Sequence, residues 1–193
     1  IQLIVERGPD AVDALPKGIR KSNEAVAETI ENNVRKLIIN ESPVDPAYYE
    51  KMSRLLDALI EQRRKGAIEY KQYLARITAL TKEAATPGGS SGGYPISMDT
   101  AAKRALYNNL SKDEALALKM DRAVQNSRMD GWRGNAMKTK RVKLAIRMVL
   151  DEASRAQQPS STTNIHQKIA TGDYPLEILT EQILELVKHQ HEY

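Results

Sequence analysis

The strongest constraint on the fold is one long periodic pattern in the first half of the chain. Its members recur every three or four residues: Tyr49, Met52, Leu56, Leu59, Arg63, Gly66, Tyr70, Tyr73, Ile77 and Leu80. A step of about 3.5 residues resembles a coiled-coil seam. Because Pro46 after Asp45 favours a helix start, we expect one helix from Pro46 to about Lys82, with another backbone close to Gly66. The alternative is that Gly66 divides it into two helices.

Shorter apolar stripes predict helices elsewhere. The first begins at Ser22 or Asn23 and buries Val26, Ile30, Val34, Leu37 and Ile38. Later helices follow Asp99 or Thr100, a Ser111-x-x-Glu114 capping box, and a turn over 130–135. For the helix after that turn, the predicted inner residues are Met137, Val142, Leu144, Ala145, Met148 and Val149. A last helix places Leu176, Leu179, Ile183, Leu184 and Val187 inside.

These patterns predict an all-α fold: a helical bundle with one long central helix and a Gly/Ser-rich connection between two helical parts. The connection is residues 87–93, which contain four Gly and two Ser and have the composition of a flexible linker. We therefore expect a part over 1–86 and a part over 94–193, with one core shared by both as the alternative. Short helical pieces are also expected at Ile1–Val5, at Asp10–Leu15, and around Ile165 and Ile169.

Composition excludes several classes of protein. The chain has no Cys, so disulfides and thiolate metal sites are excluded and a reducing, cytoplasmic location is favoured. It has no run of about 20 apolar residues, so no membrane span is expected. The opening Ile1–Gly8 has neither an initiator Met nor the pattern of a signal peptide, and resembles the end of an apolar helix. We therefore expect the chain to be part of a longer protein.

No catalytic, cofactor-binding or metal-binding residue is predicted. Glu24, Glu28 and Glu31 stand with Arg35 at the spacing of ion pairs on a helix surface. His166 has no carboxylate at metal-ligand spacing, and the pair His189 and His191 belongs to a helix end, where residues two apart point to different faces. The Gly-rich segment 87–93 lacks the Lys-Ser/Thr that a phosphate-binding loop requires.

The basic stretch 128–147 supplies the candidate contact residues. They are Arg128, Trp132, Arg133, Lys138, Lys140, Arg141, Lys143 and Arg147. Because Lys140, Lys143 and Arg147 are three and four residues apart, they share a helix face that is suited to phosphates. Two alternatives remain open: a solvated face with a buried Trp132 that anchors the turn, and a surface for an acidic protein.

Six stretches resemble the C-terminal region of the R subunits of type I restriction enzymes. They are Glu24–Ile39, Pro46–Arg64, Tyr70–Leu74, Arg104–Leu110, Asp130–Asn135 and Ile183–Tyr193. The resemblance implies that the parent chain is an ATP-dependent DNA translocase and site-specific endonuclease, whose ATP, Mg²⁺ and nuclease residues lie in upstream domains. None of those motifs occurs in this sequence, so the resemblance transfers no catalytic residue.

The resemblance also implies a role for this helical region. It would be a non-catalytic assembly module that docks the R subunit onto the methyltransferase core, with the methyltransferase and specificity subunits as partners. DNA would be reached through the complex. The alternative function is a sequence-independent DNA-binding module that uses the basic stretch 128–147.

Overall fold

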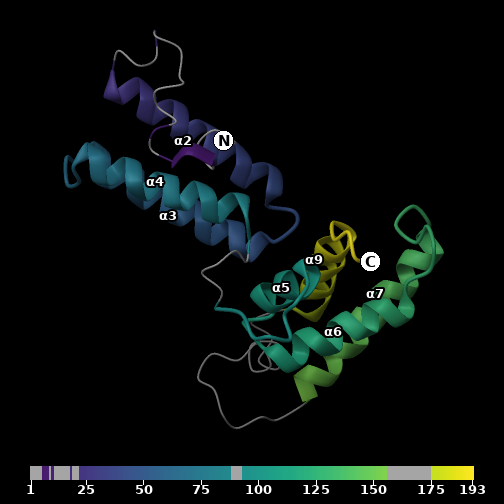
Figure 1. Cartoon of the computed structure of the whole chain (residues 1–193). Helices are drawn as coiled ribbons and strands as arrows, with labels where there is room; N and C mark the ends of the chain where they lie inside the picture. Colours follow the sequence, from purple (N-terminus) through teal and green to yellow (C-terminus); the bar gives the residue numbers. More distant parts are fainter. Residues whose placement is uncertain (1–5, 9, 11–17, 19–21, 88–92, 156–174) are drawn as a thin grey trace. The chain divides into compact units, whose positions relative to one another are not determined.

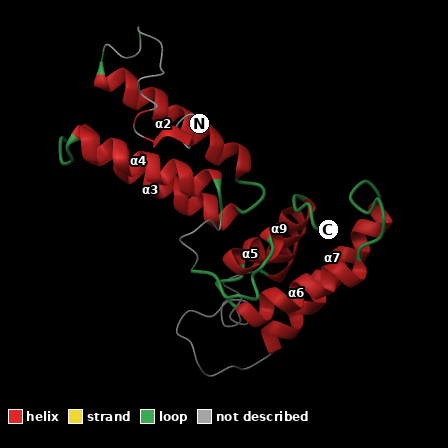
Figure 2. Cartoon of the chain, viewed as in Figure 1, coloured by secondary structure: helices red, strands yellow, loops and turns green. Residues whose placement is uncertain are grey.

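The computed structural model describes residues 6–8, 10, 18, 22–87, 93–155 and 175–193, and all the regular secondary structure among them is helical (Figure 2). The predicted all-α fold class is therefore confirmed. The described residues form two compact units, 1–42 with 48–92 and 43–47 with 93–193, which are treated separately below. The predicted helical pieces at Ile1–Val5 and around Ile165 lie outside the described residues, as do all of the piece at Asp10–Leu15 except Asp10 and most of the segment 87–93.

Within the residues that the structure describes, the first unit is built mainly from α2 (Asn23–Glu41), α3 (Pro46–Arg64) and α4 (Tyr70–Ala85) (Figure 1). Ser22 caps α2 by accepting a hydrogen bond from the backbone N–H of Glu24. Tyr48 and Tyr49, at the start of α3, donate their hydroxyl hydrogen bonds to the carbonyls of Glu83 and Ala84 at the end of α4, over 2.7 and 3.2 Å. The two helices are therefore antiparallel.

The prediction of one continuous helix from Pro46 to Lys82 is wrong. Helix α3 ends at Arg64, and Gly66 has a φ of +66°, a left-handed conformation that ends helices readily when the residue is Gly. A Cβ added to Gly66 would meet no atom within 4 Å, so the predicted close approach of another backbone is also absent. The periodic pattern continues through the break because both helices of the hairpin turn their apolar faces toward the same core.

Arg63, which interrupts the apolar pattern, joins helices α2, α3 and α4. Its Nε lies 2.9 Å from Glu31 Oε1, and its Nη1 lies 2.7 Å from Glu24 Oε1. The Tyr73 hydroxyl donates to the same Glu31 oxygen over 2.8 Å. Burial lowers the pKa of Arg63, but the bonds to Glu24 and Glu31 outweigh it and hold that pKa above its ordinary value. Burial and the bond to Glu31 raise the pKa of Tyr73.

This network corrects the interpretation of the acidic residues on α2. Glu31 is buried and pairs with Arg63 of α3, while Arg35 pairs with Asp57. The spacing of Glu31 and Arg35 on one helix is compatible with a surface ion pair, but Arg63 enters from another helix and offers Glu31 a partner inside the core.

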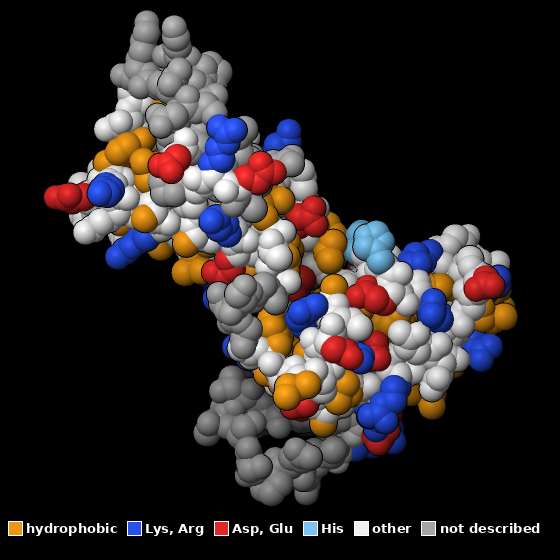
Figure 3. All heavy atoms as spheres, in the orientation of Figure 1, with side chains coloured by type: hydrophobic (Ala, Val, Ile, Leu, Met, Phe, Trp, Pro, Cys, Tyr) orange, Lys and Arg blue, Asp and Glu red, His pale blue; other side chains and the backbone are white. Residues whose placement is uncertain are grey.

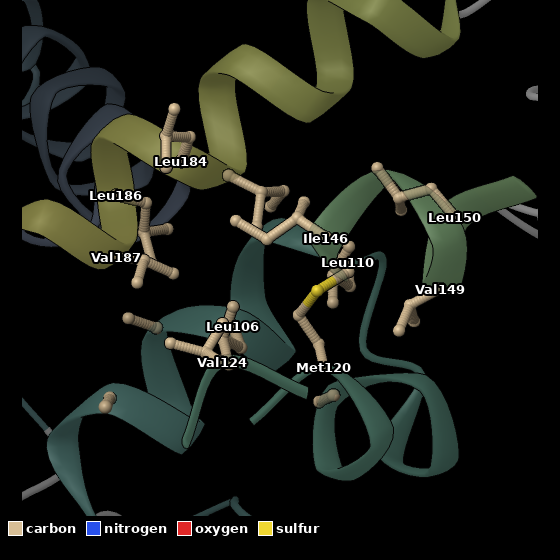
Figure 4. Close-up of a cluster of buried hydrophobic side chains, with 14 of the residues drawn as sticks. Leu106, Leu110, Met120, Val124, Ile146, Val149, Leu150, Leu184, Leu186 and Val187 are labelled. Carbon is tan, nitrogen blue, oxygen red and sulfur yellow. The ribbon is translucent and has the colours of Figure 1, made fainter. Parts of the chain in front are cut away.

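The second unit is built from α5 (Ala101–Asn109), α6 (Glu114–Ser127), α7 (Ala136–Arg155) and α9 (Leu176–Lys188). Helix α7 packs against both α6 and α9. Figure 4 shows Leu110, Met120 and Ile146 pointing toward one another in the resulting core. Thr100 caps α5 as predicted, but α6 is capped by Asp113 and not by Ser111, which has a φ of +55°.

Two segments outside these helices complete the second unit. Tyr193 donates to the buried Asp121 over 2.6 Å, and burial together with this bond raises the pKa of Tyr193. The segment 43–47 belongs to this unit although it connects α2 to α3. Its Asp45 carboxylate accepts from the Asn108 and Asn109 amides over 2.7 and 2.8 Å. The Gln190 amide donates to the carbonyl of Val44 over 2.7 Å.

Gly66→Ala is expected to lower the free energy of unfolding by roughly 1–2 kcal/mol, the cost of placing a Cβ in the left-handed region. Gly134→Ala is the control, because Gly134 has no positive φ and open space around its Cα. It should change stability by less than about 0.5 kcal/mol. Urea-induced unfolding followed by circular dichroism measures both, and equal effects would refute the role given to Gly66.

Arg63→Met is expected to cost about 3 kcal/mol, because it leaves the Glu31 carboxylate buried without its cation. The Arg63 and Glu31 side chains are only 9% and 6% exposed. Arg54→Met, which removes an exposed ion pair with Glu50, should cost no more than about 0.5 kcal/mol. Urea-induced unfolding of the two variants makes the comparison. If both variants lost a similarly small free energy of unfolding, the Arg63 network would not contribute to the stability of the fold.

Candidate interaction face on helix α7

Helix α7 follows a turn that is built around a buried tryptophan. Trp132 is 2% exposed and belongs to the core of the second unit. Thr139, in the first turn of α7, donates its hydroxyl hydrogen bond to the Trp132 carbonyl over 2.7 Å. The Asn135 side chain caps the helix by accepting from the backbone N–H groups of Met137 and Lys138. Trp132 therefore anchors the turn from inside the core.

Arg133 is occupied by contacts within the same unit. Its Nε and Nη2 donate to the carbonyls of Lys188 and Gln190 over 2.8 and 2.5 Å, where α9 ends. Its guanidinium lies 5.1 Å from the centroid of the Trp132 ring, within the range of a cation–π contact. This residue joins the end of α9 to the turn before α7.

Lys143 and Arg147, two of the three residues of the predicted phosphate face, pair with acids of α9. Lys143 Nζ lies 3.0 Å from Glu177 and 2.6 Å from Glu181, and Arg147 Nη1 lies 2.9 Å from Glu177. The bonds to Glu181 and Glu177 raise the pKa of Lys143, and the bond from Lys143 lowers the pKa of Glu177. Much of the positive charge expected on this face is therefore neutralised within the unit.

The other basic candidates are dispersed around the helix and its turn. Lys138 donates to the carbonyl of Asp130 over 2.6 Å, and Arg128 donates to the Gln125 side chain. Arg141 contacts the sulfur of Met129 at 3.7 Å. The Lys140 side chain is exposed and forms no hydrogen bond or ion pair with any residue that the structure describes. The seven Lys and Arg residues of the stretch thus do not form one continuous phosphate-binding surface.

The most exposed large apolar residues of α7 form a line along one face. Met137, Leu144 and Met148, which we call the α7 stripe, are 77%, 58% and 64% exposed. They are seven and four residues apart, and at about 100° per residue they fall within a narrow sector of the helix. In the space-filling view, exposed hydrophobic side chains of the second unit lie among both basic and acidic ones (Figure 3).

The prediction that these three residues are buried is wrong. The buried face of α7 is formed by Val142, Ile146, Val149, Leu150 and Ala153. At about 100° per residue, this set lies on the opposite side of the helix from the α7 stripe. Helix α7 therefore carries two apolar faces, of which α6 and α9 cover one. The α7 stripe is the face that reasoning from the sequence placed in the core.

The described residues show no other constellation that suggests chemistry. They contain no group of three or more His, Asp or Glu residues that could hold a metal ion. His189 Nδ1 lies 2.8 Å from the carbonyl of Glu185, His191 is exposed, and His166 lies outside the described residues. No described helix has the length and apolar content needed to cross a bilayer.

Charge reversal of Lys143 and Arg147 to Glu is expected to lower the midpoint of thermal unfolding by a few degrees at low salt, because both would then face Glu177 and Glu181. Adding Glu177→Lys and Glu181→Lys should restore the midpoint, and salt should reduce the difference. Circular dichroism melting curves of the three proteins test this. A reversed variant that melts like the wild type would show that the ion pairs do not form.

Comparison of the chain with protein-family models, with curated proteins and with solved structures finds no match. The resemblance to type I R subunits therefore stays a prediction.

Proposed function

We propose that this chain is a non-catalytic assembly module that docks the R subunit of a cytoplasmic type I restriction endonuclease onto its methyltransferase core. The observation that carries the proposal is the α7 stripe. Three large apolar side chains in line on one helix face cost free energy in water, and such lines commonly mark a surface that another protein covers. The two Met residues are suited to this role, since their flexible thioethers adapt to a partner.

The resemblance of the six stretches named above to R subunits supplies the identity of the partner. In that assignment, translocation, ATP hydrolysis and DNA cleavage belong to other parts of the parent chain. The methyltransferase and specificity subunits would meet this chain at α7, opposite the face that packs on α6 and α9.

Direct DNA binding through the stretch 128–147 is the weaker of the two functions. Phosphate binding requires cations that are free to replace counterions. Lys143 and Arg147 already pair with carboxylates, and Arg133 bonds to two backbone carbonyls. A phosphate backbone would also gain nothing by covering Met137, Leu144 and Met148.

The triple variant Met137→Gln, Leu144→Gln, Met148→Gln is expected to weaken binding to the methyltransferase core at least tenfold. Size-exclusion chromatography of the 193-residue chain with the assembled methyltransferase and specificity subunits, without DNA, shows complex formation, and a titration gives the affinity. The matched control is Ile39→Gln with Leu55→Gln, two exposed apolar residues of the first unit, which should leave binding unchanged.

Two results would contradict the proposal. One is co-elution of the triple variant with the core as efficiently as the wild type. The other is a complex that forms only when DNA is added, which would favour the DNA-binding function. Circular dichroism of the triple variant verifies that its helices are intact.

A further inference from the structure

The α7 stripe is bordered on both sides by basic residues that have no acidic partner in the described part of the chain. At about 100° per residue, Lys140 falls on one side of the line through Met137, Leu144 and Met148, and Arg141 falls on the other. Neither residue forms an ion pair with a carboxylate among the residues that the structure describes. Met129, which is 47% exposed and touches Arg141, extends the apolar surface toward the turn before α7.

The acids near the stripe are already paired. Asp151 lies 2.5 Å from Arg155 on the same helix, and Glu152 pairs with Lys119 of α6. A basic partner laid along the stripe would therefore meet Lys140 and Arg141 and find these carboxylates engaged. An acidic partner would meet two cations that are available.

From this arrangement we propose that the α7 stripe receives an amphipathic helix with acidic flanks, supplied by the partner protein. Apolar side chains at steps of three and four residues on that helix would cover the stripe, and Glu or Asp on either side of them would reach Lys140 and Arg141. This inference rests on the docking function proposed above and adds the chemical character of the partner's surface.

A second copy of this chain fits the surface less well. Two α7 helices laid side by side in parallel would bring Lys140 and Arg141 of each copy together. An antiparallel pair would bring them to Asp151 and Glu152, which are engaged by Arg155 and Lys119. Charge therefore favours a different, acidic protein.

The test uses two fluorescent 18-residue peptides that share one face of Leu at helical spacing. One peptide carries Glu on both flanks and the other carries Lys. Fluorescence anisotropy with the 193-residue chain is expected to show that the Glu peptide binds at least tenfold more tightly than the Lys peptide. Its affinity should fall as salt is added, because the charged rim is exposed.

Two double variants test whether Lys140 and Arg141 cause the preference for the Glu peptide. Lys140→Glu with Arg141→Glu should weaken binding of the Glu peptide about tenfold or more and strengthen binding of the Lys peptide. Lys51→Glu with Lys71→Glu makes the same change in net charge at two exposed lysines of the first unit and should alter neither. The triple Gln variant of the stripe should bind neither peptide.

Equal affinity for the two peptides, or no binding of either up to about millimolar concentration, would overturn the inference. So would binding of a 20-base-pair DNA duplex that is lost in the Lys140→Glu, Arg141→Glu variant while the Glu peptide fails to compete for it. If the methyltransferase core still binds the wild type and not the triple variant, docking stands and only the acidic helix is wrong. If the peptides are distinguished as expected and the core does not bind, only the proposed function fails.

Discussion

Helix α7 can be covered by its own unit on only one side, and the surface of the second unit depends on which side that is. Ile146 and Leu150 enter the core between α6 and α9, and this orientation fixes where every other residue of the helix points. Lys143 and Arg147 are turned toward the acids of α9. Met137, Leu144 and Met148 are turned away from the unit. The orientation of α7 about its axis thus determines both that Lys143 and Arg147 are paired with acids and that the α7 stripe is exposed.

The first unit depends on a different kind of contact. Arg63 brings a charge into a mostly apolar seam, and it is tolerated because Glu31, Glu24 and the face of the Tyr73 ring surround it. Such a network is compatible with few alternative packings of the three helices, since any shift would leave a charged group without its partner. A shift of α3 along α2 would separate Arg63 from Glu24 and Glu31, so the ion pairs oppose it.

The sequence predicted where the helices begin better than which face of each helix is buried. The helix starts at Ser22, Pro46 and Thr100 follow from local chemistry, because capping residues and proline act within one turn. The continuous helix expected through Gly66 is divided there, because a 3.5-residue apolar repeat is the same along a helical hairpin as along one helix. The buried face of α7 was predicted only in part. Val142 and Val149 are buried as predicted, but Met137, Leu144 and Met148 are exposed. This helix has apolar residues on both sides, and its neighbours determine which side is covered. The pairing of Lys143 with Glu177 joins residues far apart in the sequence, so no local pattern could show it.

The segment 43–47 limits where this chain can be divided. It lies between two helices of the first unit, yet Asp45 and the carbonyl of Val44 satisfy amides of Asn108, Asn109 and Gln190 in the second. This segment therefore belongs to the second unit in space, although in the sequence it lies within the first. A piece that begins after the glycine-rich connection would retain α5, α6, α7 and α9 but lose Asp45 and Val44, whose oxygens accept these hydrogen bonds. A gene truncated at the glycine-rich segment 87–93 would therefore not encode the whole second unit.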